Sequence, residues 1–238
     1  MPGEQMSEQQ VAAYIHLDLR EVNKLASRGQ IPCRKVAGRF VFRKGEVDHW
    51  VETQMHGLGK DRLAKIERGV SAHHGFDETI PLVIPLIPTG GLAVPLEARS
   101  RDAALRSLVK LADGAGLVDD RDDLLRHILE REELCSTALV PGVALPHPRH
   151  PLPGDIEASF VVAGLAPSGI PYGSPDGSLT RLFFLICCKD DRTHLHVLAR
   201  LGRMLQDRRD IEKLMEAASP RELHQTIEKL EQVAIAEG

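Results

Sequence analysis

The chain has 238 residues, long enough for one large domain or two smaller ones. Hydrophobic residues make up 42% of the sequence and charged residues 27%, values that support packed cores in a water-soluble protein. The formal net charge of −4 excludes a cationic surface over the whole molecule, so any nucleic-acid-binding surface must be a local basic patch.

The cysteines predict reduced thiols rather than disulfides. They are Cys33, Cys135, Cys187 and Cys188, which form no CxxC pair, and vicinal cysteines cannot readily form an unstrained disulfide. No apolar run approaches the roughly 20 residues that span a bilayer. The stretch "MPGEQMSEQQ" lacks the basic and apolar segments of a signal peptide. We therefore expect a cytoplasmic protein without a membrane span.

Residues 1–56 predict a small module of helices with one β-hairpin. A capping box that begins at Ser7 starts a first helix, and a second box that begins at Asp18 starts another, which Gly29 ends. Two short β-prone runs surround Ala37-Gly38 and predict a hairpin. An apolar pattern that includes Trp50 predicts a closing helix.

Residues 57–79 are polar and glycine-rich, which predicts a linker, and residues 80–236 predict a second domain. In this domain the continuous apolar runs "ASFVVAGLA" and "RLFFLICC" are typical of strands that are covered on both faces. Helical patterns occur in "DDRDDLLRHILEREEL", in "THLHVLARLGRMLQD" and after Ser219. The alternation favours an α/β layered domain.

A basic cluster lies between Arg20 and Lys44, where eight basic residues accompany one acid, Glu21. Three of the cations fall at helical spacing and the other five lie on the predicted hairpin. A cationic helix can enter a DNA major groove while a basic hairpin grips phosphates. The alternative is an ordinary solvated charged face, and composition alone leaves both interpretations open.

The order of parts in "SEQQVAAYIHLDLREVNKLASRGQIPCRKVAGRFVFRKGEVDHWV" resembles the excisionase-type, MerR-related winged helix-turn-helix over residues 7–52. The resemblance implies DNA binding, although some relatives of this module bind protein instead. It assigns DNA contacts on the recognition helix and on the wing to Arg20, Asn23, Lys24, Arg28, Arg39 and Arg43. Because one such module offers little surface for reading bases, specific recognition would need two copies, from a homodimer or at neighbouring half-sites.

His147 lies between Pro146 and Pro148, which fix the backbone that carries the imidazole. Three interpretations are open from the residues alone. His147 can be a structural residue in a turn. It can be a metal ligand with His150, His194 and His196, although no Cys or acid stands at a zinc-type spacing. It can also be a nucleophile in phosphoryl transfer, for which residues of the right type are Arg131, Arg149, Ser136, Thr137 and His194.

The stretch "LEREELCSTALVPGVALPHPRH" resembles the active-site signature of the phosphotransferase-system EIIA domain of the fructose, mannitol and nitrogen-regulatory class. "HLHVLARLGRML" resembles the helix that carries this family's second active-site histidine. The resemblance implies that His147 accepts a phosphoryl group, that His194 hydrogen-bonds it, and that Arg131 supplies positive charge. It also implies a three-layer domain with a mixed, mainly parallel sheet between helices.

Together the two resemblances imply a regulatory phosphocarrier that forms a phosphohistidine with an HPr-type protein as donor, needs no cofactor or metal, and couples phosphorylation to DNA binding. One departure from the family pattern is Pro148, which removes a backbone N–H next to the nucleophile. The alternative is therefore an EIIA-like sensor that is not phosphorylated, with a helix-turn-helix that docks on a protein.

Overall fold

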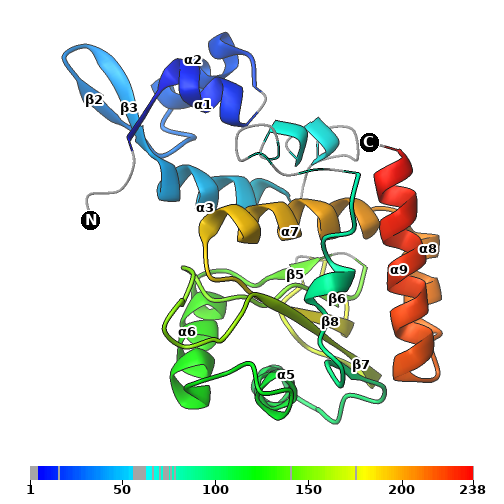
Figure 1. Ribbon diagram of the computed structural model, residues 1–238. Helices are drawn as coiled ribbons and strands as arrows, with labels where there is room; N and C mark the ends of the chain where they lie inside the picture. Colours follow the sequence, from blue (N-terminus) through cyan, green and yellow to red (C-terminus); the bar gives the residue numbers. More distant parts are fainter. Residues whose placement is uncertain are drawn as a thin grey trace.

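The computed structural model describes residues 5–15, 17–55, 63–65, 67–69, 71, 75, 77, 79–139, 141–174 and 176–237, without the side chains of residues 48, 49 and 52–55. Figure 1 shows a small N-terminal module that lies against a larger α/β domain, with helix α7 (Asp191–Met204) at their boundary. Within the described residues, no helix is both long enough and apolar enough to cross a membrane.

The first module contains the two predicted helices, the predicted hairpin and the closing helix. Its elements are β1 (Gln5–Ser7), α1 (Glu8–Tyr14), α2 (Leu19–Ser27), β2 (Arg34–Val36), β3 (Arg39–Arg43) and α3 (Lys44–Met55). The capping box at Ser7 is confirmed, and the Asp18 carboxylate caps α2 by accepting a hydrogen bond from the Arg20 amide, 2.7 Å away. The sequence did not predict β1, which pairs antiparallel with β3 and makes the hairpin a three-stranded sheet.

The second domain is built on a five-stranded sheet in the order β4-β7-β8-β6-β5. Its strands are β4 (Leu92–Ala93), β5 (Ala138–Leu139), β6 (Val143–Ala144), β7 (Phe160–Ile170) and β8 (Thr180–Cys187). Its helices are η1 (Ile84–Leu86), α5 (Arg101–Gly114), α6 (Arg121–Leu134), α7, α8 (Arg208–Met215) and α9 (Pro220–Ala236).

The sheet is mixed, as predicted, but the expectation that it is mainly parallel is wrong. β4 with β7 and β6 with β8 are parallel pairs, whereas β7 with β8 and β5 with β6 are antiparallel, and β7–β8 is the longest ladder. β8 and the first seven residues of β7 are almost entirely buried on both faces, so their apolar runs look like those of a parallel sheet. Only a short loop joins them, and a parallel pair would need a longer crossover connection.

Alternation along the strands divides the interior into two hydrophobic cores. On β8, Phe183 and Leu185 join the core under α5 and α6, while Phe184 and Ile186 point to the opposite face. This opposite face is covered by α7, α8 and α9. The result is the expected three-layer arrangement, which Figure 1 shows with the sheet between the helices.

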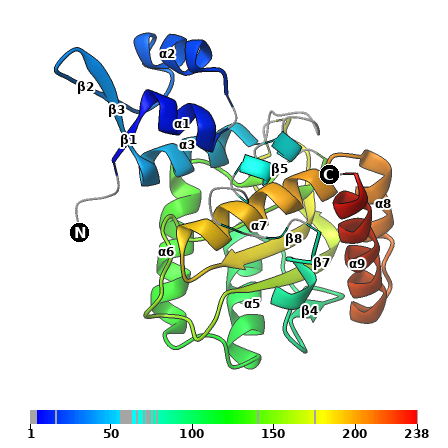
Figure 2. The same cartoon turned by 45° about the horizontal axis from the view of Figure 1, so that its top comes forward.

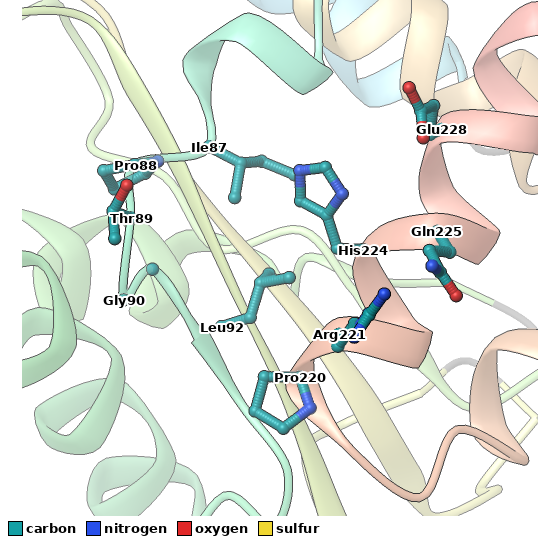
Figure 3. A pocket seen from close by; sticks show the side chains of 11 residues that line it. Ile87, Pro88, Thr89, Gly90, Leu92, Pro220, Arg221, His224, Gln225 and Glu228 are labelled. Carbon is teal, nitrogen blue, oxygen red and sulfur yellow. The ribbon is translucent and has the colours of Figure 1, made fainter.

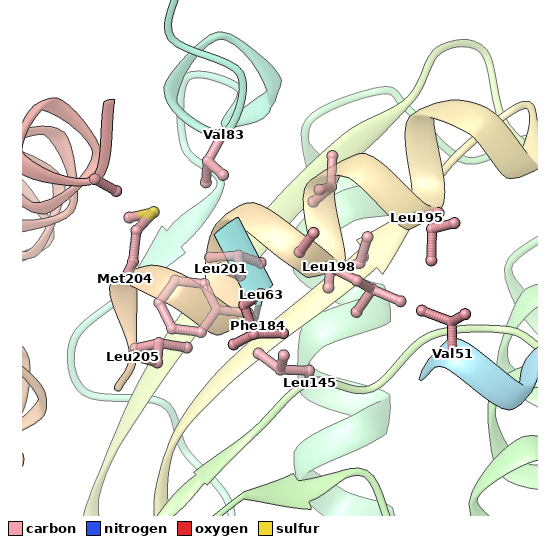
Figure 4. Packing of buried hydrophobic residues seen from close by; sticks show 14 of the residues in the cluster. Val51, Leu63, Val83, Leu145, Phe184, Leu195, Leu198, Leu201, Met204 and Leu205 are labelled. Atoms are coloured by element: carbon pink, nitrogen blue, oxygen red, sulfur yellow. The ribbon is translucent and has the colours of Figure 1, made fainter. Parts of the chain in front are cut away.

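The core on the α7 side continues into the first module. Buried residues of α1, α2 and α3 belong to the same cluster as those of α7 and the sheet. Figure 4 shows Val51 of α3 opposite Leu195 at the start of α7, with Leu63 beside the later turns of that helix. The two modules therefore share one continuous apolar interior.

Candidate functional site

The topology of the sheet brings His147 and His194 together. β6 and β8 are parallel neighbours, so their carboxyl ends lie at the same edge. The pairing continues past β6, where the Ile186 amide donates to the Pro146 carbonyl over 2.9 Å. His147 comes next in the chain, and His194 lies in the first turn of α7, which follows β8. The centroids of the two imidazole rings are 5.0 Å apart, with the planes at 57°.

The backbone around His147 selects the tautomer of its ring. Nδ1 lies 2.7 Å from the carbonyl oxygen of Leu145, and a carbonyl oxygen can only accept a hydrogen bond. The proton of the neutral ring is therefore on Nδ1, which leaves the lone pair on Nε2. Nε2 is then the nitrogen of His147 that can act as a nucleophile.

Glu132 of α6 positions the strand that leads to His147. Its buried carboxylate accepts hydrogen bonds from the amide and the hydroxyl of Thr137. The Thr137 carbonyl accepts in turn from the Leu145 amide, 3.1 Å away, and Leu145 holds Nδ1 of His147. Burial raises the pKa of Glu132 above its ordinary value, although the hydrogen bonds from Thr137 act in the opposite direction.

Of the other residues predicted for this site, Arg131 is a buried cation. It is buried at the end of α6, and one of its terminal nitrogens donates to the Cys135 carbonyl over 2.8 Å. Its Nε is also buried and makes no hydrogen bond with the residues that the structure describes. The Ser136 hydroxyl donates to the Tyr172 carbonyl over 3.1 Å, and that of Thr137 donates to Glu132. Arg149 is exposed.

Both histidines are inaccessible to solvent. His147 is 1% exposed and His194 is 6% exposed. The sequence predicted a rigidly held imidazole that receives a phosphoryl group, and in this structure the ring is buried. The structure therefore shows the histidine pair in a buried, closed arrangement.

The remaining histidines do not extend the pair. His150 is exposed, and His196 points to the other side of α7, where its Nε2 lies 2.8 Å from the Ser71 hydroxyl. Among the described residues, one cluster of three potential metal ligands occurs, formed by Asp123, His127 and Asp155, and it contains none of the histidines considered for a metal site.

A groove of about 490 Å³ lies between residues 87–92 and the first turns of α9. Figure 3 shows His224 extending across it toward Ile87, with Arg221 on the same helix. None of the residues predicted for phosphoryl transfer lines this groove.

The residues predicted to contact DNA lie on α2 and β3, and Figure 2 shows α2 and the hairpin on the side of the first module away from the α/β domain. Arg20, Lys24 and Arg28 are exposed along α2, and Arg39 and Arg43 are exposed on β3. Asn23 is half-buried on α2. Arg43 also pairs with Glu46 over 3.6 Å.

Sequence reasoning missed two buried carboxylates. Glu132 stands next to Arg131 inside the stretch that resembles the EIIA signature, and its place in that stretch was the available signal. Glu67 lies in the segment predicted as a linker, and its side chain is buried against Arg200 and Arg203 of α7. The two arginines are 133 and 136 positions away from Glu67, so no local pattern marks it.

The fold and the quoted signature point to one class of domain, and comparison with known proteins gives the family. Residues 89–230 match the family model described as "Phosphoenolpyruvate-dependent sugar phosphotransferase system, EIIA 2", and the chain belongs to this family. Residues 6–55 match a helix-turn-helix domain model, so the first module is a helix-turn-helix domain.

Curated relatives match the second domain. The EIIA component of the fructose-specific system of Haloferax volcanii is 32% identical over 50% of this chain and 77% of its own length. A nitrogen regulatory protein of Bradyrhizobium diazoefficiens is 30% identical over 57% of this chain and 87% of its own length. The fructose-specific EIIABC component of Bacillus subtilis is 27% identical, and the match spans only 21% of that longer protein.

Solved structures show the same fold. The nitrogen regulatory protein IIA-Ntr of Neisseria meningitidis matches with a TM-score of 0.56 at 23% identity, over 62% of this chain and 99% of its own. The mannitol enzyme IIA of Escherichia coli, solved in complex with phosphorylated enzyme IIB, matches with a TM-score of 0.51 at 22% identity, over 59% of this chain and 95% of its own.

Proposed function

We propose that this protein is a regulatory phosphocarrier that accepts a phosphoryl group on His147 from an HPr-type protein. The observation that carries the proposal is the pairing of His147 and His194, 5.0 Å apart at the carboxyl ends of two parallel strands. This edge of an α/β sheet is where ligands bind in such folds. The same proposal places the protein in the cytoplasm, where a phosphorylated donor and DNA are both available.

The chemistry is a reversible in-line transfer. Nε2 of His147 attacks the phosphorus of the donor's phosphohistidine, a new N–P bond forms as the donor's N–P bond breaks, and the electron pair of that bond returns to the donor's imidazole. Nδ1 keeps its proton and donates it in a hydrogen bond to the Leu145 carbonyl, which stabilises the positive charge that develops on the ring.

Two groups are suited to stabilise the transferred phosphate. His194 lies across from His147 in the first turn of α7, where the helix dipole also favours an anion. Arg131 carries a buried positive charge, and an incoming phosphate would satisfy its Nε–H. Ser136 and Thr137 position the loop in this proposal, and the exposed Arg149 is suited to contact the donor protein.

The second part of the proposal is that the helix-turn-helix domain binds DNA through its exposed cations. α2 would enter a major groove, with Arg20, Lys24 and Arg28 available for contacts, and the hairpin would grip phosphates through Arg39 and Arg43. Two copies would act together on one operator, as a homodimer or at neighbouring half-sites. Phosphorylation adds nearly two negative charges to the second domain, which supplies the means of regulation.

Labelling with phosphoenolpyruvate and the upstream phosphotransferase proteins tests the assignment. We expect the wild-type protein to be labelled and His147→Ala to be unlabelled, with the exposed His150→Ala as the matched control. Undiminished labelling of His147→Ala would refute the assignment. A mobility shift with genomic DNA fragments tests the first module separately.

Two observations favour a second candidate, an unphosphorylated EIIA-like sensor with a helix-turn-helix that docks on a protein. His147 is buried, and the residue that follows it is Pro148, which has no N–H to offer a phosphate. This sensor would show neither labelling nor a mobility shift.

A further inference from the structure

Helix α7 is covered on both sides. From His194 to Leu201 every residue is buried. A helix that packs only on a sheet buries one stripe and leaves the opposite side polar and exposed. Here the outer side of α7 holds His196, Arg200 and Arg203, and all three are buried as well. Something other than the sheet therefore covers the outer side.

The apolar part of this cover comes from α3 and from the segment at Leu63. Val51 of α3 is buried and faces Leu195, one residue after His194 (Figure 4). Leu63 is buried over Gly202, where a β-carbon would lie 3.4 Å from its Cδ1. Both belong to the apolar cluster that includes α7.

The polar part of the cover is an ion cluster around Glu67. The Glu67 carboxylate lies 2.5 Å from Nε of Arg200 and 2.5 Å from a terminal nitrogen of Arg203. Ser71 adds a hydrogen bond with His196. Burial alone would raise the pKa of Glu67, but hydrogen bonds with His196 and Arg203 and the charges of both arginines lower it to about 2. The carboxylate therefore remains ionised, and its negative charge is paired with the two arginines of α7.

We propose that α3 and residues 63–65, 67–69 and 71 form an intramolecular cover on α7 that holds the histidine pair closed, and that His147 accepts a phosphoryl group only when this cover opens. The inference rests on the proposed phosphocarrier function. In the closed state α2 and the hairpin remain exposed on the far side of the module, so the cover uses a surface that DNA would not (Figure 2). Opening of the cover would move the DNA-binding surface relative to the second domain. This surface is already exposed in the closed state, so opening would not be needed to expose it.

Position 202 offers a test from the side of α7. Gly202→Ala adds a β-carbon at an ordinary contact distance from Leu63, so the cover stays closed. Gly202→Phe places a ring where Leu63 lies and pushes the cover away while leaving every buried charge in place. If the closed state dominates by about ten to one, opening raises the reaction rate of His147 about tenfold.

Position 51 offers an independent test from the side of α3. Val51→Asp buries a charge against Leu195 if the cover stays docked, so docking is lost. The matched control is Val36→Asp, the same change at an exposed valine of the same module. Far-UV circular dichroism and the thermal transition of the second domain confirm that each variant is folded.

Two readouts are measured on the full chain: carbethoxylation of His147 by diethyl pyrocarbonate, located by mass spectrometry, and the initial rate of phosphoryl labelling. Gly202→Phe and Val51→Asp are each expected to speed carbethoxylation about tenfold over wild type and over their controls. An unchanged rate of His147 carbethoxylation in both folded variants overturns the proposal that the cover closes the histidine pair. Faster carbethoxylation with no labelling of any variant supports the cover and overturns the phosphocarrier function.

Discussion

The exposed face of the helix-turn-helix domain and the buried histidine pair both carry candidate functional residues, yet their environments are opposite. The cations of α2 and β3 stand in solvent, where each interaction is screened and contributes little alone. The histidines lie in a hydrogen-bonded frame in which Leu145, Thr137 and Glu132 fix one another. The first region presents its charges to solvent, whereas the second holds its titratable groups buried and fixed by neighbouring hydrogen bonds.

The largest expected effect is a loss of stability from a substitution in the core between the sheet and α7. Phe184 is fully buried between the sheet and α7. Phe184→Ala is expected to lower the free energy of unfolding by about 3–5 kcal/mol, because a cavity remains in the shared core. Val36→Ala on the exposed hairpin is the control, with a change within about 0.5 kcal/mol. Urea unfolding measures both, and equal losses would contradict the contrast between the two regions.

The ion cluster at Glu67 makes the closed region sensitive to acid. The pKa of Glu67 falls to about 2 in the folded protein, below its ordinary value of 4.5. A lowered folded pKa contributes stability that is fully present above pH 4.5 and is lost as the pH falls toward 2. This lowering of the Glu67 pKa corresponds to about 3 kcal/mol in the free energy of unfolding.

Glu67→Gln removes this titration. At pH 6 the variant is expected to unfold at a lower urea concentration than wild type, because Arg200 and Arg203 lose their anion. The difference between the two proteins should shrink as the pH falls toward 2. A constant difference across this range would show that Glu67 does not titrate in the folded state as the structure indicates.

Most elements of the fold could be predicted because their signals are local. The capping residues Ser7, Asp18 and Ser219 mark helix starts that the structure confirms. β1 could not be predicted, since three residues carry no period and their pairing with β3 is non-local. The parallel character of the sheet was overestimated because strands buried on both faces have the same apolar composition in either direction.

The candidate site was predictable in its members but not in its accessibility. The resemblance to the EIIA family singled out His147 and His194, and the structure places them side by side. Their closure depends on contacts such as Glu67 with Arg200, which join residues 133 positions apart. A segment with few apolar residues and several glycines looks like a linker until its buried partners are known.

On the exposed region, single substitutions should have moderate effects that depend on salt. Lys24→Ala removes one exposed cation from α2. We expect weaker binding to all DNA sequences. The slope of the logarithm of the binding constant against the logarithm of the salt concentration should fall in magnitude by about 1, since one counterion fewer is released. Arg208→Ala, which removes an exposed cation from α8, is the control. Fluorescence anisotropy at several salt concentrations gives the slopes. If Lys24→Ala had the same slope as wild type and Arg208→Ala, the DNA-binding surface would lie elsewhere.

The smallest expected effect concerns the turn of the hairpin. Ala37 and Gly38 both have positive φ, at 47° and 82°, as a two-residue hairpin turn of this hand requires. Alanine in this region costs about 1–2 kcal/mol, and glycine avoids that strain but loses more backbone entropy on folding.

Ala37→Gly is therefore expected to stabilise the first module by about 0.5 kcal/mol. Gly38→Ala should destabilise it by a similar or larger amount, although a β-carbon there has no neighbour within 4 Å. Thermal unfolding followed through Trp50 fluorescence measures both changes. Opposite signs would show that backbone strain governs this turn. Because neither change alters charge, the salt slope of DNA binding should stay the same in both variants, which separates the rigidity of the exposed region from its electrostatics.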